Sequence, residues 1–218
     1  MLLRINDIAP DFIADSSKGK ISFHRWIGDK WAILFSHPKD FTPVCTTELG
    51  CMAKLEPEFT ERHCKLIGLS TDSVSHHDSW AMDIEETQGH KVTYPIIADT
   101  NLAIAKLYNM LPAETVNSEG QSVETFATIR SVFIIAPDKK IRMVMTYPMS
   151  TGRNFNEILR VLDAIQLTDR HQVVTPANWQ YGDDVIISPS VSDAEAREKY
   201  PQGFKTLKPY LRLVKQPS

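Results

Sequence analysis

The sequence predicts an α/β fold, in which a sheet is covered by helices, followed by a small C-terminal module. Strand-like and helix-like segments alternate from residue 31 to about residue 166. Most of the strand-like segments are continuous apolar runs, as in strands that are buried on both faces. After residue 167, five prolines divide the chain into short segments, which indicates a separate module. We therefore expect domains at 1–167 and 168–218.

Local patterns justify each element in turn. Strands are expected at 31–36, 64–70, 94–98, 130–136 and 141–147, and helices at 44–62, 75–86, 102–108 and 154–166. Pro57 is expected to break or kink the first helix near Glu56, because proline removes a helical hydrogen bond. Residues 137–140 have turn chemistry and predict a hairpin between the last two strands. The polar segment 111–128 is expected at the surface, and 192–200 is the expected helix of the C-terminal module.

Composition narrows the classes of protein. The 218 residues are 42% hydrophobic and 23% charged, which is ordinary for a globular chain. A formal charge of -3 gives no electrostatic reason to expect nucleic acid or an anionic membrane as a partner. No secretory signal and no run long enough to span a bilayer is recognised. Three cysteines, confined to one third of the chain, favour a reducing compartment, and we expect the cytoplasm.

Cys45 is the most informative residue. It lies at the start of the expected helix 44–62, shortly after the strand-like run 31–36. A cysteine there faces unpaired backbone N–H groups and the positive end of the helix dipole, and both favour thiolate over thiol. An unperturbed thiol, with a pKa of about 8.5, is ionised to only a few per cent at pH 7. The sequence therefore predicts a reactive sulfur.

The residues around Cys45 have the spacing Pro38-x-x-x-Thr42-x-x-Cys45. This spacing resembles the active-site signature of the peroxiredoxins, thiol peroxidases with a thioredoxin-like fold built on a central mixed sheet. Arg130 before an apolar strand and the segment 147–154 extend the resemblance, which covers essentially the whole chain. The tail from Thr175 onward is similar to that of the one-cysteine branch, the peroxiredoxin 6 subfamily.

The resemblance implies a role for each residue of the motif. Cys45 would attack hydrogen peroxide or an organic hydroperoxide, phospholipid hydroperoxides included, and become a sulfenic acid. Thr42, which is also a natural helix N-cap before Pro43, and Arg130 would bind and polarise the peroxide. Pro38 would narrow the pocket. Supporting roles fall to His37, beside the thiolate, and to the expected ion pair of Glu48 and Arg153, which would hold Arg130 in place.

One cysteine is expected to suffice. Thr175 stands where related two-cysteine peroxiredoxins carry a resolving cysteine. Cys51 lies six residues after Cys45 on the same expected helix, too far along it for a disulfide, and Cys64 should be buried in a strand. The resemblance thus implies an external thiol reductant, such as glutathione, no metal or organic cofactor, and a homodimer.

Two other functions are considered. Some one-cysteine peroxiredoxins are credited with phospholipase A2 activity from a serine, a histidine and an aspartate. His24 and Asp138 match two of these, but Lys30 stands in place of the serine, so this activity is not expected. A peroxide sensor or chaperone without turnover would also use Cys45. The adjacent pairs His76-His77 and His63-Cys64 do not converge as metal ligands would, and no metal site is predicted.

Overall fold

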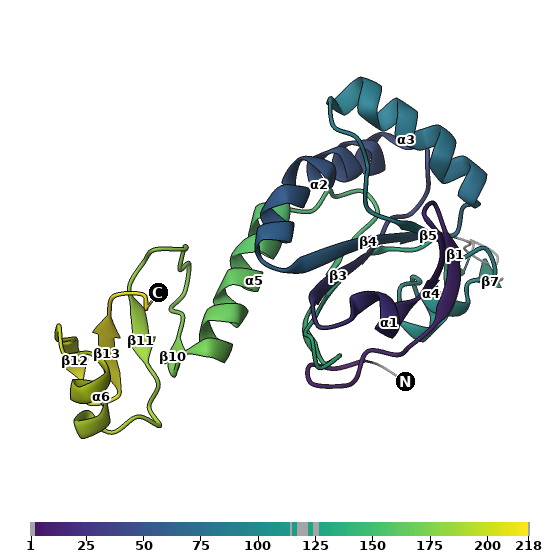
Figure 1. The fold of residues 1–218 in the computed structure, drawn as a ribbon. Helices are drawn as coiled ribbons and strands as arrows, with labels where there is room; N and C mark the ends of the chain where they lie inside the picture. The colour runs from purple at the N-terminus through teal and green to yellow at the C-terminus, as the bar shows by residue number, and fades with distance from the viewer. Residues whose placement is uncertain (1–2, 114, 117–121, 124–126, 218) are drawn as a thin grey trace. The chain divides into compact units, whose positions relative to one another are not determined.

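The computed structural model describes residues 3–113, 115–116, 122–123 and 127–217. The chain forms two compact units, Met1–Arg153 and Asn154–Ser218 (Figure 1). The first unit contains all of the expected site residues. Residue 167, the expected domain boundary, lies near the end of helix α5 (Phe155–Arg170), which belongs to the second unit.

A seven-stranded sheet forms the centre of the first unit, in the order β2-β1-β5-β4-β3-β8-β9. The strands are β1 (Ile13–Ser16), β2 (Gly19–Ser22), β3 (Trp31–Ser36), β4 (Cys64–Ser70), β5 (Ile96–Ala98), β8 (Arg130–Ile135) and β9 (Ile141–Tyr147). β3, β4 and β5 are parallel, whereas the other neighbours are antiparallel, so the sheet is mixed, as expected. β1 and β2 were not predicted, because half of their residues are exposed and no apolar run marks them.

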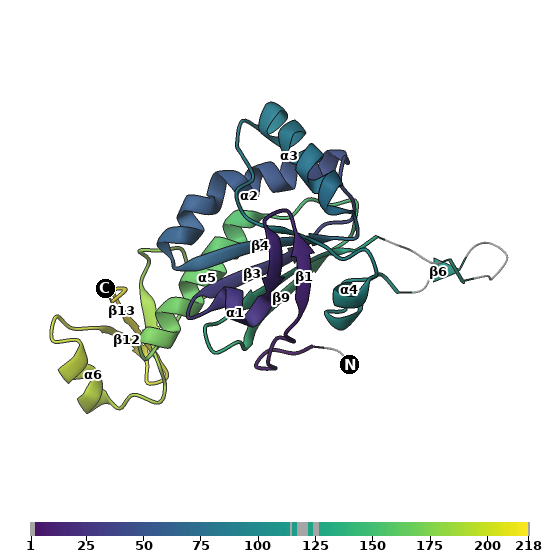
Figure 2. The same ribbon diagram turned by 45° about the vertical axis from the view of Figure 1, so that its right-hand side comes forward.

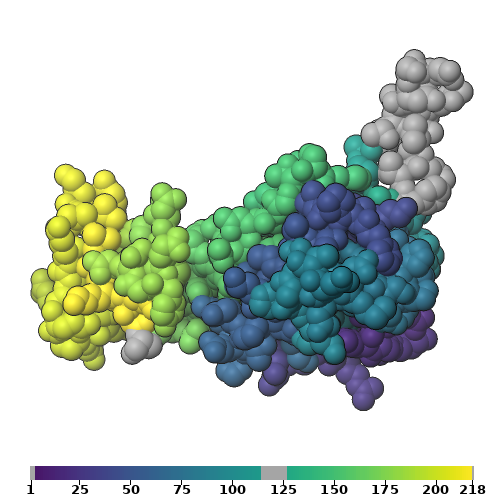
Figure 3. Space-filling model, turned by 90° about the horizontal axis from the view of Figure 1, so that it is seen from above, coloured from purple at the N-terminus to yellow at the C-terminus, as the bar shows by residue number. Residues whose placement is uncertain are grey.

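Helices cover both faces of this sheet (Figures 1 and 2). α2 (Pro43–Glu61) and α3 (Val74–Gln88) lie on one face, and α1 (Phe23–Ile27) and α4 (Ala103–Leu107) lie on the other. In the space-filling view of Figure 3, the residues of α2 and α3, in blue to teal, lie on the surface of the molecule. α2 connects β3 to β4, and α3 connects β4 to β5, and both connections cross between parallel strands in the same direction along the sheet. Because such crossovers are right-handed, the two helices lie on the same face.

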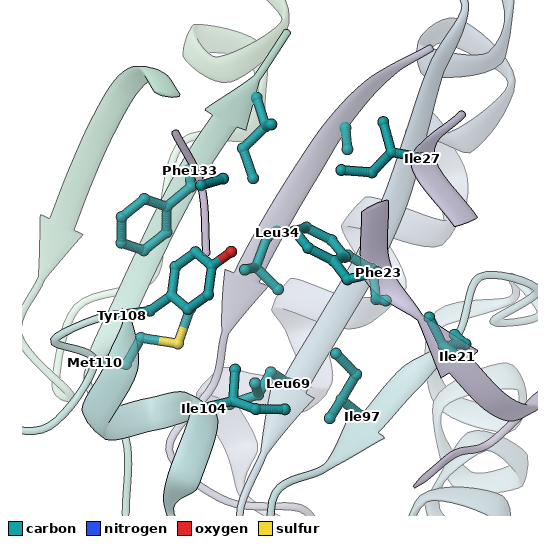
Figure 4. Close-up of a cluster of buried hydrophobic side chains, with 14 of the residues drawn as sticks. Ile21, Phe23, Ile27, Leu34, Leu69, Ile97, Ile104, Tyr108, Met110 and Phe133 are labelled. Carbon is teal, nitrogen blue, oxygen red and sulfur yellow. The ribbon is translucent and has the colours of Figure 1, made fainter. Parts of the chain in front are cut away.

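The core on the α1 and α4 face is apolar and aromatic (Figure 4). Leu34 of β3 meets Phe23 of α1, and Tyr108, which follows α4, packs edge-on against Phe133 of β8 with ring centroids 5.3 Å apart. Because strand side chains alternate between faces, Phe35 points to the opposite face, where its ring lies 5.7 Å from that of Tyr94. Both faces of β3 are therefore buried.

Of the break or kink expected near Glu56, the break is wrong, because helix α2 is continuous through Pro57. Proline removes one backbone hydrogen bond and crowds the preceding turn, but the chain stays helical on both sides of Pro57. At the other end of the sheet, β8 and β9 form the hairpin expected around residues 137–140. Half of the expected surface segment 111–128 lies outside the described residues, which include the paired two-residue strands β6 (Thr115–Val116) and β7 (Ser122–Val123).

The second unit has its own sheet and core. Its four strands are antiparallel in the order β10-β11-β13-β12, and comprise β10 (Val173–Val174), β11 (Val185–Ile187), β12 (Lys205–Lys208) and β13 (Leu211–Val214). The short helix α6 (Asp193–Lys199) begins with a capping box between Ser192 and Glu195. Trp179 is buried at the centre of an apolar cluster. Among all described residues, no helix combines the length and the apolar character needed to cross a membrane.

Candidate active site

Cys45 is the third residue of α2, and Pro43 is the first. The loop from His37 to Thr42 connects the end of β3 to this helix, so the sulfur lies where the sheet ends and the helix begins. The backbone N–H groups of the first helical turn have no partners within the helix, as expected from the sequence. The Cys45 side chain has no exposed surface.

Arg130 brings a permanent positive charge to this sulfur. Its Nη1 donates to Cys45 Sγ at 3.3 Å and to Glu48 Oε2 at 2.6 Å. Its Nε and Nη2 both donate to the carbonyl oxygen of Met149, at 3.0 and 2.6 Å. The guanidinium is only 2% exposed and is held on three sides, so its orientation toward the sulfur is fixed.

Glu48 joins Arg130 to a second buried arginine, Arg153. Glu48 Oε2 accepts from Arg153 Nη2 at 2.7 Å, and Oε1 accepts from Nε at 2.9 Å and from the backbone N–H at 2.8 Å. Burial by itself would raise the pKa of Glu48, but the hydrogen bond and charge of Arg153, aided by Arg130, lower it overall. The carboxylate is therefore ionised at neutral pH and balances part of the positive charge around the sulfur.

Arg153 also connects this cluster to the sheet. Its Nη1 donates to the carbonyl oxygens of Ser36, at 2.8 Å, and Ser131, at 3.0 Å. Its guanidinium carbon lies 5.5 Å from the centre of the Phe35 ring. The arginine thus fixes the end of β3 against the start of β8, the two places from which His37 and Arg130 project.

Pro38 and Thr42 occupy the loop before α2. Pro38 is buried, and Thr42 is partly buried at the N-cap position. The Thr42 side chain accepts no capping hydrogen bond, in contrast to the expected capping role; its hydroxyl instead donates to the carbonyl oxygen of Lys39 at 2.8 Å. The hydroxyl oxygen retains lone pairs that can accept a further hydrogen bond.

His37 is fully buried, although a strand-end histidine is usually partly exposed. Its Nε2 lies 2.7 Å from Asp40 Oδ1, and the other oxygen of Asp40 lies 2.6 Å from Nδ1 of His77, which is on α3. Sequence reasoning missed Asp40 and His77. Helical periodicity could have indicated His77, because it lies on the same buried face of α3 as Trp80 and Ile84.

The other two cysteines are unsuited to the role of Cys45. All three are free thiols. Cys64 is buried in β4, as expected, and desolvation raises the pKa of its thiol well above the ordinary value. Desolvation also raises the pKa of Cys51, and the nearby Lys54 opposes this only in part. Cys45 is the cysteine whose sulfur receives a hydrogen bond from an arginine.

One group of side chains could be considered for a metal ion. His37, Asp40 and Asp72 offer ligand atoms within 4.8 Å of one another. Oxygens of both carboxylates already accept hydrogen bonds: those of Asp40 from the two histidines, and Asp72 Oδ2 from Ser70 Oγ and the Asp40 amide. These hydrogen bonds explain the arrangement without an ion.

The chain is similar to known proteins along nearly its whole length. Residues 5–144 match the AhpC/TSA family, and residues 164–203 match the C-terminal domain of 1-Cys peroxiredoxin. A 1-Cys peroxiredoxin of Dictyostelium discoideum is 54% identical over 216 residues, covering 99% of this chain and 86% of its own.

Two solved structures are similar along nearly the whole chain. A cysteine-to-serine mutant of the peroxiredoxin 6 of Arenicola marina has a TM-score of 0.91 and 44% identity, with 99% of both chains covered. A yeast mitochondrial 1-Cys peroxiredoxin, described for its thiol resolving mechanism through glutathione and thioredoxin systems, has a TM-score of 0.87 and 53% identity. The match covers 98% of this chain and 100% of the yeast one.

These findings define the chain first as a thiol peroxidase with a thioredoxin-like fold, an antioxidant oxidoreductase. The chain belongs to the AhpC/TSA family and, within it, to the 1-Cys peroxiredoxins, the group that includes peroxiredoxin 6. The expected fold class and enzyme class are thereby confirmed.

Proposed function

We propose that Cys45 is the single peroxidatic cysteine and that it reduces hydrogen peroxide and organic hydroperoxides. The observation that carries this proposal is the hydrogen bond from Arg130 Nη1 to Cys45 Sγ at the buried start of α2. A fixed cation and the helix N-terminus both favour a thiolate, which is the nucleophilic form of cysteine.

The first half of the reaction follows from this arrangement. The thiolate attacks the terminal oxygen of the hydroperoxide, and the S–O bond forms as the O–O bond breaks. The displaced alkoxide, or hydroxide from hydrogen peroxide, takes up a proton and leaves as alcohol or water, and Cys45 becomes a sulfenic acid. Arg130 and Thr42 bind the peroxide oxygens, Pro38 shapes the pocket, and Glu48 with Arg153 holds Arg130 in place.

An external thiol completes the cycle. It attacks the sulfenic sulfur and releases water, leaving a mixed disulfide that a second thiol resolves. In support, Thr175 occupies the position of the resolving cysteine of two-cysteine relatives, and Cys51 and Cys64 have raised thiol pKa values. The yeast relative is described with glutathione and thioredoxin systems, and we propose a reductant of this class here.

Stopped-flow oxidation of the reduced protein tests the proposal. One equivalent of hydrogen peroxide should oxidise Cys45 alone, as read by mass after sulfenate trapping, without an internal disulfide. The Cys45→Ser variant should lose all thiol-dependent turnover, and a Cys51→Ser/Cys64→Ser double variant should keep it. Residual turnover in Cys45→Ser, or a disulfide between Cys45 and another cysteine, would contradict the mechanism.

Two alternatives are distinguished by the same assay. A sensor or chaperone would oxidise at Cys45 once but would not turn over with added thiol. The phospholipase A2 activity remains disfavoured because Lys30, an exposed lysine, replaces the serine. His24 is half-buried with its Nε2 2.7 Å from the Ala9 carbonyl oxygen, and Asp138 is exposed.

Further proposals concern organisation. We keep a peroxidase domain at 1–167 and a C-terminal module at 168–218, supported by family matches that end at residue 144 and resume at residue 164. We also propose a homodimer, which a light-scattering mass twice that of the chain would support. The cytoplasm is the proposed compartment, supported by three free thiols, although one relative is mitochondrial.

A further inference from the structure

A buried series of hydrogen bonds leads from α3 to the loop of the proposed site. His77 and His37 have no exposed surface, and Asp40 between them is 2% exposed. Each carboxylate oxygen of Asp40 contacts one histidine ring: Oδ2 lies 2.6 Å from His77 Nδ1, and Oδ1 lies 2.7 Å from His37 Nε2. Buried ionisable groups are retained only when they satisfy one another, and here a single carboxylate serves two imidazoles.

This arrangement determines where His37 carries its proton. Burial by itself would raise the pKa of Asp40, but the hydrogen bonds from His37 and His77 lower it to about 2. At neutral pH the side chain is therefore a carboxylate, which can only accept hydrogen bonds. The ring nitrogen of each histidine that faces Asp40 must then be an N–H donor, and for His37 this nitrogen is Nε2.

The second nitrogen of His37 is left as a free acceptor. Burial is the main cause that lowers the pKa of His37, so the ring is neutral at pH 7 and carries one proton. That proton is on Nε2, so Nδ1 presents a lone pair. No residue that the structure describes gives Nδ1 a hydrogen bond, although the atom is buried. A buried acceptor without a donor is unfavourable, and a molecule that brings an O–H group would satisfy it.

The neighbours of His37 belong to the proposed site. The carbonyl of the preceding residue, Ser36, is bound by Arg153. The His37 ring lies 5.1 Å from the Trp80 ring, and Trp80 Nε1 donates to the hydroxyl of Thr46, the residue after Cys45, at 3.1 Å. Through Trp80, the His37 ring is thus linked to the first turn of α2, which carries Cys45.

We infer that Asp40 and His77 are positioning residues that hold His37 in its Nε2–H tautomer, so that Nδ1 accepts the O–H of the hydroperoxide. The inference rests on the proposed role of Cys45 as the peroxidatic cysteine. His77 acts on His37 indirectly: it hydrogen-bonds to Oδ2 of Asp40 and thereby fixes the orientation of the carboxylate. His77 is itself held in place, because its Nε2 lies 3.2 Å from the Ile97 carbonyl oxygen.

The tautomer can be measured in the reduced protein without any peroxide. A long-range ¹⁵N–¹H spectrum of the full-length protein with labelled histidine should show, for His37 at pH 7, a protonated Nε2 and an unprotonated Nδ1. The His37→Gln variant assigns these signals by their loss. A protonated Nδ1, or an imidazolium, would overturn the inference.

Kinetics of Cys45 oxidation test the acceptor. In His37→Gln, the amide can still reach Asp40 but leaves no acceptor at the Nδ1 position, and oxidation should slow about tenfold. In His37→Asn, a carbonyl oxygen can replace Nδ1, and part of the rate should return. Oxidation of His37→Gln at the wild-type rate, or equal losses in the two variants, would refute the acceptor role.

The positioning role has a matched control on α3. His77→Gln should slow oxidation about threefold and add signals of the second His37 tautomer, because one hydrogen bond to Asp40 is lost. His76→Gln, at an exposed neighbour, should change neither measurement. A His77→Gln variant with the wild-type spectrum and rate would refute the role of His77. If Cys45 of the wild-type protein does not react with peroxide at all, the proposed function is wrong. The His37 tautomer is measured without peroxide, so that result tests the roles of Asp40 and His77 independently.

Discussion

Replacing Glu48 by glutamine keeps the shape of the side chain and removes its charge. In the wild-type protein its two oxygens accept three hydrogen bonds from the guanidinium groups of Arg130 and Arg153 and one from the backbone of Arg153. Both arginines and the carboxylate are at least nine-tenths buried. An amide offers one acceptor oxygen and turns an NH₂ group toward donors that it cannot satisfy.

The expected cost follows from these contacts. At least two charge-assisted hydrogen bonds are lost, each contributing about 1.5–3 kcal/mol. Breaking a buried ion pair by removing one partner costs about 3–5 kcal/mol, which agrees with this estimate. We therefore expect Glu48→Gln to lower the free energy of unfolding by about 3–5 kcal/mol at pH 7.

Urea unfolding followed by circular dichroism, at one fixed protein concentration, measures this change. Glu58→Gln on the same helix is the control: Glu58 pairs with Arg62 at 2.9 Å but is largely exposed, so its loss should cost less than about 1 kcal/mol. A loss below about 1 kcal/mol for Glu48→Gln would refute the account of the buried cluster.

The same experiment has a defined pH dependence. The pKa of Glu48 is lower in the folded protein than its ordinary value, because the stabilising contacts with Arg153 and Arg130 outweigh burial. Its contribution to stability is thus present above the pKa of the unfolded chain, about 4.3, and is lost as the pH falls through the folded value. The difference between wild type and Glu48→Gln should therefore narrow in acid.

Three further predictions concern charge, acid stability and packing. Arg130→Lys retains a positive charge but loses the planar set of N–H donors that binds Cys45, Glu48 and Met149 together. The thiolate should then be less favoured, so alkylation of Cys45 by iodoacetamide at pH 7 should slow about tenfold or more; an unchanged rate would contradict the role of the guanidinium. The Asp40 pKa of about 2 predicts that Asp40→Asn costs about 2 kcal/mol at neutral pH. This difference should disappear as the pH falls through 2, and a constant difference in urea unfolding across pH would count against it. A Cβ on Gly50 would clash with Cβ and Cγ of Gln88, so Gly50→Ala should lower the free energy of unfolding by about 1–3 kcal/mol. A neutral effect would show that the end of α3 moves aside without cost.

Much of the fold could be predicted because its signals are local. β3, β4 and β8 are buried over all or nearly all of their length, and their apolar runs stand out in the sequence. Helix α5 has apolar residues at helical spacing. β1 and β2 lack such runs, and half of their residues are exposed, whereas the strands of the second unit are only two to four residues long. Their place in a sheet depends on partners elsewhere in the chain.

The motif around Cys45 could also be predicted from residues that are close together in the sequence. Pro43 at the first helical position, Thr42 before it and Cys45 within the first turn are all fixed by residues within a few positions of one another. The sequence also indicated Arg130 and Glu48, but only through resemblance to a family. Composition and spacing by themselves would have left Arg130 as an ordinary arginine at the end of a strand.

The sequence by itself thus determined the buried strands, the longer helices and the cysteine at a helix start, and the family resemblance added the threonine in place of a resolving cysteine. Only the tertiary structure decided which charges meet. Antiparallel pairing of β8 with β3 brings Arg130 to Glu48 across 82 residues, and Arg153 reaches the same carboxylate across 105. His77 reaches Asp40 across 37 residues because α3 packs beside α2 on one face of the sheet. Contacts between residues so far apart in the sequence depend on the order of the strands in the sheet and on which face each helix covers. Both are set by the packing of the whole unit, and no local sequence pattern shows them.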